Sequence, residues 1–216
     1  MNNIIFAFDF SMNKPAMVSY INGKINFYIF PSDIDSKSFE KLKYCGINIH
    51  PRNLPKMKDK SLSQHELIVE HVNRAIHLAD IIVSTINDIL KENNIQSKDN
   101  VIIANEGFAF SAKGDAALDL SGYKYILMYH LMIDGFNKFK TYSPITIKHT
   151  AGCSKRGLGK DAMIEALGKE DKSLHPIISA LKESPEILKK KTSYVLCMDD
   201  IADAYWCMKT CLNDNE

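Results

Sequence analysis

Acidic residues stand at the ends of three apolar segments of this chain. The four acids are Asp9, Glu106, Asp200 and Asp203. The first lies in segment 4–10 and the second closes segment 101–106, and both segments have the apolar character of buried strands. A carboxylate in such a place costs free energy unless a positive charge compensates it, and bound cations are the usual compensation. The pattern therefore predicts a divalent metal site.

The order of the predicted elements constrains the fold. Segments 16–21 and 24–30 are joined by Asn22-Gly23, the strongest short signal for a β-hairpin. In chain order, we expect strands 3–10, 16–21 and 24–30, helix 64–90, strand 101–106, helix 115–136, strand 140–142, helix 160–167 and a final helix capped by Asp199 or Asp200. This order is that of an α/β, ribonuclease-H-like fold, a mixed five-stranded sheet flanked by helices. In that fold the first and fourth strands are neighbours and the last helix packs near them, which brings the four acids together.

Length and composition indicate one domain. The chain has 216 residues, 45% of them hydrophobic, so it can bury a sizeable core, and no linker or repeat divides residues 1–216. Residues 31–63 form an excursion to which no structure is assigned. No apolar run reaches the roughly 18 residues of a membrane span, and the five cysteines contain no C-x-x-C pair. We expect a cytoplasmic protein without a membrane partner, a disulfide framework or a zinc ribbon.

The four acids also predict the kind of metal. Asp200 and Asp203 are three residues apart, so a helix presents both on one face. Oxygen donors without His or Cys favour Mg²⁺, or Mn²⁺, over zinc. Two such ions in one active site can activate water on one side of a phosphorus atom and stabilise the leaving oxygen on the other. The chemistry expected of such a site is phosphodiester hydrolysis.

Basic residues gather locally although the formal net charge is only +1. One cluster comprises Lys148, His149, Lys155, Arg156 and Lys160, and the other comprises Lys41, Lys43, Arg52, Lys56, Lys58 and Lys60. A local basic stripe is what binding to a phosphate backbone needs. Each cluster can equally be a solvated surface. We expect Lys155 and Arg156 of the first cluster to bind DNA.

Several motifs accompany the acids. Segment 104–110 reads ANEGFAF and is followed by a small-residue helix start, AALDLSG, at 116–122. Segment 142–152 reads YSPITIKHTAG, and Lys160 follows Lys148 by twelve positions. In this order they resemble the RuvC-type Holliday junction resolvases, which have a catalytic acid before a helix, a Tyr-x-Pro-x-x-x-Lys-x-Thr segment, a second lysine at the head of a helix and a final Asp-x-x-Asp pair.

The resemblance implies a metal-dependent endonuclease that resolves four-way or other branched DNA as a homodimer. It implies that the four acids, Asp9, Glu106, Asp200 and Asp203, are catalytic metal ligands. Lys148 and Lys160 are then basic residues at the mouth of the site, Lys160 with a catalytic role. It also implies that Phe108 or Phe110 stacks on a DNA base. Richness in Asn, Ile and Lys points to a low-GC genome such as that of a phage or virus, whose protein acts in the host cytoplasm.

Other interpretations of the same residues remain open. A ribonuclease-H-like nuclease can instead cut flaps, forks or RNA/DNA hybrids, and a protein with an inactive site can merely bind branched DNA. An actin-like ATPase shares the sheet but needs glycine-rich phosphate loops, and none follows Asp9. Taken singly, Asp9 can be a hydrogen-bonded structural acid and Asp200 can be a helix cap.

Overall fold

The protein was described from a computed structural model of residues 4–44, 46–52, 62–107, 115–155, 158–170 and 193–215. Its elements in chain order are β1 (Ile4–Asp9), β2 (Ala16–Ile21), β3 (Lys24–Ile29), α1 (Ser36–Tyr44), β4 (Asn48–Ile49), α2 (Gln64–Glu92), β5 (Val101–Glu106), α3 (Asp115–Ile133), β6 (Lys138–Tyr142), α4 (Pro144–Thr150), α5 (Lys160–Glu170) and α8 (Ser193–Asn213). None of the described helices combines the length and apolar character that crossing a membrane requires.

A mixed sheet forms the centre of the molecule, with strand order β4-β3-β2-β1-β5-β6. Strands β1, β2 and β3 are antiparallel neighbours, whereas β5 and β6 continue the sheet parallel to β1. The predicted hairpin is confirmed: Asn22 and Gly23 have φ angles of 52° and 84°, the left-handed pair that a tight turn of this kind requires. The α/β, ribonuclease-H-like arrangement expected from the sequence is therefore confirmed.

The prediction of five strands was wrong, because the sheet of the described residues has six. The additional strand, β4, lies inside the 31–63 excursion and pairs in parallel with the end of β3. Two residues are too few to show the period-2 pattern by which a strand is found in a sequence. The excursion therefore contributes helix α1 and an edge strand, while its residues 53–61 lie outside the described part.

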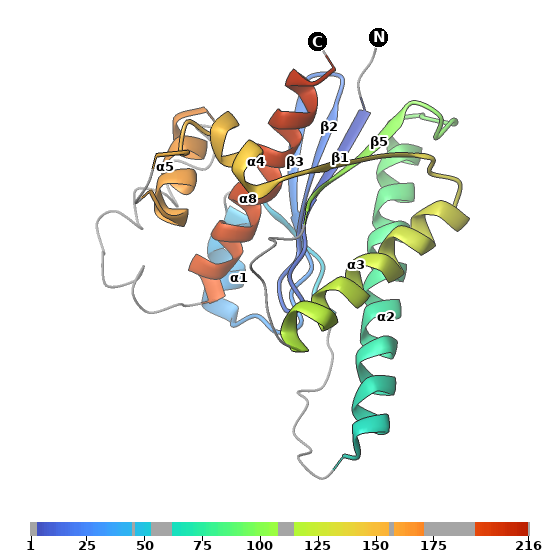
Figure 1. The fold of residues 1–216 in the computed structure, drawn as a ribbon. Coiled ribbons are helices and arrows are strands. Elements are labelled where there is room, and N and C mark those ends of the chain that lie inside the picture. The colour runs from blue at the N-terminus through green and yellow to red at the C-terminus, as the bar shows by residue number, and fades with distance from the viewer. Residues whose placement is uncertain are drawn as a thin grey trace.

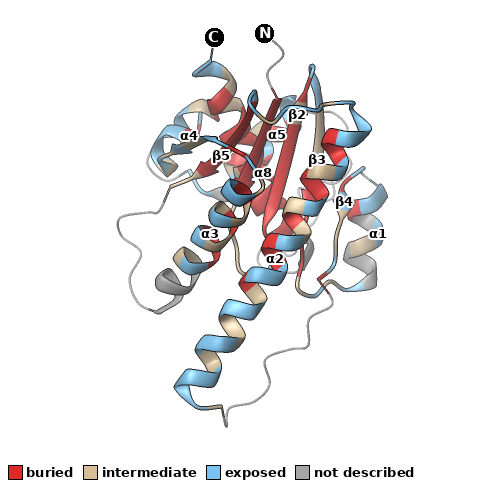
Figure 2. Cartoon of the chain, turned by 90° about the vertical axis from the view of Figure 1, so that its right-hand side faces the viewer, coloured by how far each residue is buried: buried red, intermediate tan, exposed pale blue. Residues whose placement is uncertain are grey.

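Helices cover both faces of the sheet (Figure 1). Alternate residues of β1 point to opposite faces, so Phe6 and Phe8 pack against α2 and α3, while Ile5 and Ala7 pack against α8 and its neighbours. Helix α8 crosses β1, β2 and β5 and also contacts α1, α4 and α5. The N-terminal part of α2 extends beyond the sheet and is largely exposed (Figure 2). The two buried layers thus meet at β1, which carries Asp9 at its end.

Helix ends agree with the sequence in one case and disagree in another. The start of α2 is a capping box, in which the Ser63 side chain accepts from the Glu66 backbone and the Glu66 carboxylate accepts from the Ser63 N–H. The helix ends at Asn93, near the predicted Asn93-Asn94. The prediction that Asp199 or Asp200 caps the last helix was wrong, because the backbone is already helical from Ser193. Asp200 is therefore an interior residue of α8.

The packing of α8 predicts a strong effect of one core substitution. Ile201 on α8 is fully buried in the core formed by α8, its neighbouring helices and the sheet. We expect Ile201→Ala to lower the free energy of unfolding by about 3 kcal/mol, since it removes buried methyl groups and leaves a cavity. Denaturant unfolding measures this loss. Ile145→Ala on α4, where the residue is 76% exposed, should change stability by less than about 0.5 kcal/mol; equal losses for both variants would contradict the packing.

Candidate metal centre

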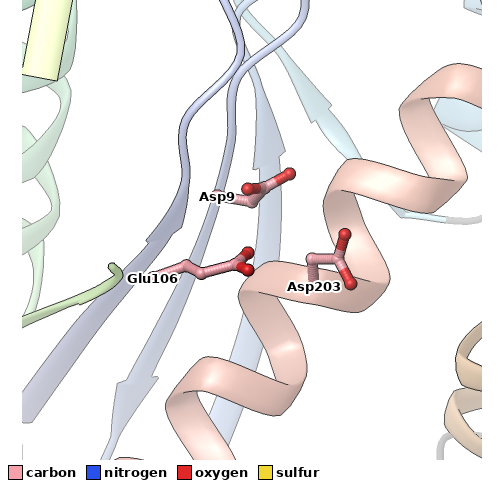
Figure 3. A group of neighbouring side chains, drawn as sticks. All are labelled: Asp9, Glu106 and Asp203. Carbon is pink, nitrogen blue, oxygen red and sulfur yellow. The ribbon is translucent and has the colours of Figure 1, made fainter. Parts of the chain in front are cut away.

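Three of the four predicted acids lie together at one edge of the sheet. Asp9, Glu106 and Asp203 each offer an oxygen atom, and these atoms lie within 4.8 Å of one another. Their side chains point toward a common space from β1, β5 and α8 (Figure 3). The part of the chain that the structure describes holds no other such group of three or more His, Cys, Asp or Glu residues.

Strand pairing explains how residues almost a hundred positions apart meet. Strands β1 and β5 are parallel neighbours whose register places Phe8 opposite Asn105. Their next residues, Asp9 and Glu106, therefore leave the sheet side by side at its C-terminal edge, where ligands of α/β sheets usually bind. Helix α8 packs across both strands and brings Asp203 over this edge. The arrangement is a direct consequence of the fold.

The close approach of β6 supports the end of β5. The backbone N–H of Gly107, directly after Glu106, donates to the carbonyl oxygen of Tyr142 at 2.7 Å. A Cβ atom at position 107 would lie 3.3 Å from both the Tyr142 oxygen and a Thr141 methyl group. The Asn105 amide donates to the Lys140 carbonyl oxygen and accepts from the Thr141 hydroxyl. Asn105 thus ties β5 to β6.

The donor set fits a hard divalent cation. All three carboxylates are partly buried, and two unit charges about 5 Å apart repel by about 3 kcal/mol at an effective dielectric constant of ~20. Oxygen donors without sulfur or imidazole are the ligands that Mg²⁺ and Mn²⁺ prefer. The nearby Cys207 thiol is not a competing anion, because burial, reinforced by Cys211, Glu106 and Asp9, raises its pKa well above the usual value.

A buried lysine beside the acids was not found from the sequence. Lys124 on α3 is only 4% exposed, and its Nζ donates a hydrogen bond to the backbone oxygen of Glu106. Burial lowers the pKa of Lys124, while the negative charges of Glu106 and Asp9 act in the opposite direction. The ammonium group therefore places a positive charge next to two of the three carboxylates. In the sequence, Lys124 lies between two tyrosines of a predicted helix, and this pattern does not indicate a buried lysine beside an acidic site.

The remaining predicted site residues differ in how the structure places them. Asp200 is buried with 8% exposure and is not part of the group of three. Its charge instead acts on the neighbouring Cys197 thiol, whose pKa rises to about 12, chiefly through burial. Asp200 as a metal ligand stays a prediction.

The predicted DNA-binding residues lie only in part within the described chain. Lys148 on α4 and Lys155 in the loop after it are exposed. Lys160 begins α5, but its side chain is outside the described part, as are Phe108, Phe110 and Arg156. Helices α4 and α5 both pack against α8, the helix that carries Asp203. Helix α4, which carries Lys148, is thus next to the helix of the candidate centre.

Comparisons with known proteins gave structural likenesses only. No protein-family model and no curated protein matches the sequence. Among solved structures, RuvC of Thermus thermophilus is similar, with a TM-score of 0.46 and 12% identity over 98% of this chain and 96% of that one. The same protein in complex with Holliday junction substrate gives 0.45 and 10% over the same shares. The yeast mitochondrial Holliday junction resolvase gives 0.43 and 12% over 97% of this chain and 77% of that one.

Repulsion among the three acids predicts opposite effects of one substitution with and without metal. In EDTA, we expect Asp203→Asn to raise the melting temperature by about 2–4 °C, which corresponds to about 1 kcal/mol of relieved repulsion. Mg²⁺ or Mn²⁺ should stabilise the wild type and not this variant. Differential scanning fluorimetry measures both effects, with the exposed Asp99→Asn as control. A wild type that neither ion stabilises would contradict the assignment.

The position of Lys124 predicts a defect that metal ions repair. In EDTA, we expect Lys124→Met to lower the free energy of unfolding by about 2 kcal/mol or more, because a buried cation is lost beside two carboxylates. The deficit should shrink in Mg²⁺, since the bound cation replaces the missing charge. Denaturant unfolding under both conditions measures it, with the exposed Lys138→Met as control. An equal deficit with and without Mg²⁺ would show that Lys124 acts by packing alone.

Proposed function

We propose that this protein is a metal-dependent endonuclease that cuts branched DNA, with four-way junctions as its main substrate. The observation that carries the proposal is the group formed by Asp9, Glu106 and Asp203 at the C-terminal edge of a ribonuclease-H-like sheet. The sequence motifs resembling RuvC-type resolvases support the choice of substrate.

The three carboxylates would hold two Mg²⁺ ions per site, with Mn²⁺ as a substitute, and Asp200 would serve as the fourth ligand. When bound, the ions supply activation of water and stabilisation of the leaving oxygen in phosphodiester hydrolysis. Lys124 keeps the end of β5 in place through the Glu106 carbonyl. Lys160, at the start of α5, is proposed to offset the charge that develops on the scissile phosphate.

The basic residues around α4 are proposed to bind the DNA backbone. Lys148 and Lys155 are exposed. Lys148 lies on α4, which packs against α8, Lys155 lies in the loop that follows α4, and Arg156 is the next residue of the sequence. Phosphate contacts of this kind position DNA and make binding sensitive to salt. Phe108 or Phe110, close after Glu106 in the sequence, is proposed to stack on a base at an opened junction.

Substituting one metal ligand separates catalysis from binding. We expect Asp9→Asn to abolish cleavage of an immobile four-way junction, because it removes a ligand charge, while junction affinity stays within about threefold. Gel assays with wild type and variant, in Mg²⁺ or EDTA, measure both quantities. Paired symmetric nicks that disappear with EDTA or with the variant are the expected result. Cleavage by Asp9→Asn at the wild-type rate would contradict the role of Asp9 as a metal ligand.

Alternative substrates belong in the same assay. Linear duplex, a flap, a fork and an RNA/DNA hybrid are run beside the junction. If a flap, a fork or the hybrid is cut and the junction stays intact, the protein is a nuclease whose substrate is not the four-way junction. Junction binding without any cleavage would favour a DNA-binding protein without nuclease activity, and ATP hydrolysis without DNA cleavage would favour the actin-like interpretation.

A homodimer is proposed to present two active sites to the junction. Four large side chains of α3 are exposed by 60% or more and follow helical spacing along one stripe. They are Tyr125, Tyr129, Met132 and Ile133. Val72 and Ile76 are also exposed, on α2, the helix that packs against α3. An exposed apolar stripe like that of α3 is typical of a protein interface.

The interface predicts which substitution yields monomers. We expect Tyr129→Glu combined with Ile133→Glu to convert dimers to monomers, since each places a charge in a buried apolar contact. Sedimentation velocity at several protein concentrations measures the change. Tyr44→Glu on α1, where the side chain is 83% exposed, should leave the dimer intact. A wild type that remains monomeric with junction DNA bound would contradict the proposal.

A further inference from the structure

The start of the 31–63 excursion lies against the connection between β1 and β2. There the Ser32 N–H donates to the Asn13 carbonyl oxygen at 2.7 Å. Further along the excursion, the Arg52 N–H donates to the Pro31 carbonyl oxygen at 3.0 Å. Residues 10–15, here called the β1–β2 turn, follow directly after Asp9 in the chain. Pairing with Pro31 thus brings Arg52 back to the start of the excursion, beside the segment that leaves the candidate metal centre.

The side chain of Arg52 donates two hydrogen bonds to this turn. Its Nη2 donates to the carbonyl oxygen of Met12 at 2.6 Å and to that of Asn13 at 2.9 Å. The side chain reaches across about forty positions of sequence and is buried, with 4% exposure of the residue. A guanidinium group presents several donors in a fixed plane, so it can hold two neighbouring carbonyl groups in a single arrangement.

Burying this cation is unfavourable in itself. Burial lowers the pKa of Arg52 to about 10, and nearby Arg74 lowers it as well. Within the described residues, no carboxylate forms an ion pair with Arg52, and its Nε atom has no hydrogen-bond partner. A neutral, apolar side chain would avoid this cost. What the arginine supplies in return is the hydrogen bonding to the β1–β2 turn.

Other contacts also restrain the turn: the Phe30 N–H donates to the Pro15 carbonyl oxygen at 3.0 Å, and Phe10 and Met12 pack against the buried layer of α2 and α3. The last pair of the β1–β2 ladder joins Asp9 to Ala16, so the six residues between them lie outside the sheet. Within the turn, the Lys14 N–H donates to the Ser11 hydroxyl at 3.0 Å. A metal ligand at the last residue of a strand depends on the segment that follows it for its orientation, and groups that orient ligands affect metal affinity strongly.

We propose that Arg52 is a positioning residue that holds the β1–β2 turn, and with it Asp9, in the geometry that binds the cation. The excursion then supports the active site as well as extending the sheet. This inference rests on the proposed function, because it requires Asp9 to be a metal ligand.

Three variants test the inference on the DNA-free protein. We expect Arg52→Met to weaken Mn²⁺ binding about tenfold, the lower end of the effect of groups that orient ligands. Arg52→Lys keeps a donor and should fall between this variant and the wild type. The matched control is Asn48→Ala, which removes a hydrogen bond from the excursion to the Phe27 carbonyl oxygen and does not touch the turn; its affinity should stay within about twofold of wild type.

The measurements are isothermal titration calorimetry with Mn²⁺ and hydrogen exchange of a peptide covering residues 9–16. Faster exchange in Arg52→Met, with unchanged exchange in Asn48→Ala, is expected. Arg52→Met with wild-type affinity, or equal weakening by Arg52→Met and Asn48→Ala, would overturn the inference. If Arg52→Met does not fold, Arg52→Lys decides, and wild-type affinity and exchange in that variant count against the inference.

The same experiment separates this inference from the proposed function. A wild type that binds Mn²⁺ but cuts no DNA would refute the nuclease and leave the Arg52 result valid. A nuclease whose Mn²⁺ affinity is insensitive to Arg52→Met would refute the inference alone. A wild type that binds no Mn²⁺ would overturn both.

Discussion

The repulsion among three half-buried carboxylates is the constraint on which the rest of the structure depends. Asp9, Glu106 and Asp203 share a space in which their oxygen atoms lie within 4.8 Å of one another. A fold tolerates this only if positive charge is close and the surrounding elements cannot move apart. Lys124 supplies such a charge from α3, and the pairing of β1 with β5 beneath α8 supplies the rigidity.

The two faces of the sheet contribute differently to the centre. The face covered by α8 provides the third acid and places α4 and α5, with their exposed basic residues, beside it. The face covered by α2 and α3 provides Lys124 and the exposed apolar stripe proposed for the dimer. Strand β1 belongs to both layers. The proposed chemistry, DNA binding and assembly therefore fall on different surfaces around one central strand.

Much of this architecture could be predicted from local patterns. Alternation, the Asn22-Gly23 turn and a long helical period indicate the elements, and acids that end buried strands indicate a site wherever those strands are parallel neighbours. Patterns of this kind carry no information on burial of single polar residues. Arg52 belongs to a basic cluster that the sequence indicates as a phosphate-binding stripe or a solvated surface, and Lys124 gives no signal at all, yet both residues are buried by tertiary contacts. Asp200 was predicted to cap the last helix because Asp is a preferred cap residue. This local preference carries no information on the residues from Ser193 onward, which are already helical.

Diffraction from crystals soaked in Mn²⁺ tests the central claim most directly, because anomalous scattering locates the ion without reference to activity. We expect an anomalous peak among the carboxylates of Asp9, Glu106 and Asp203, and loss of this peak in Asp203→Asn crystals treated in the same way. An absence of density there, with Mn²⁺ bound elsewhere or not at all, would contradict the assignment of these acids as a metal centre.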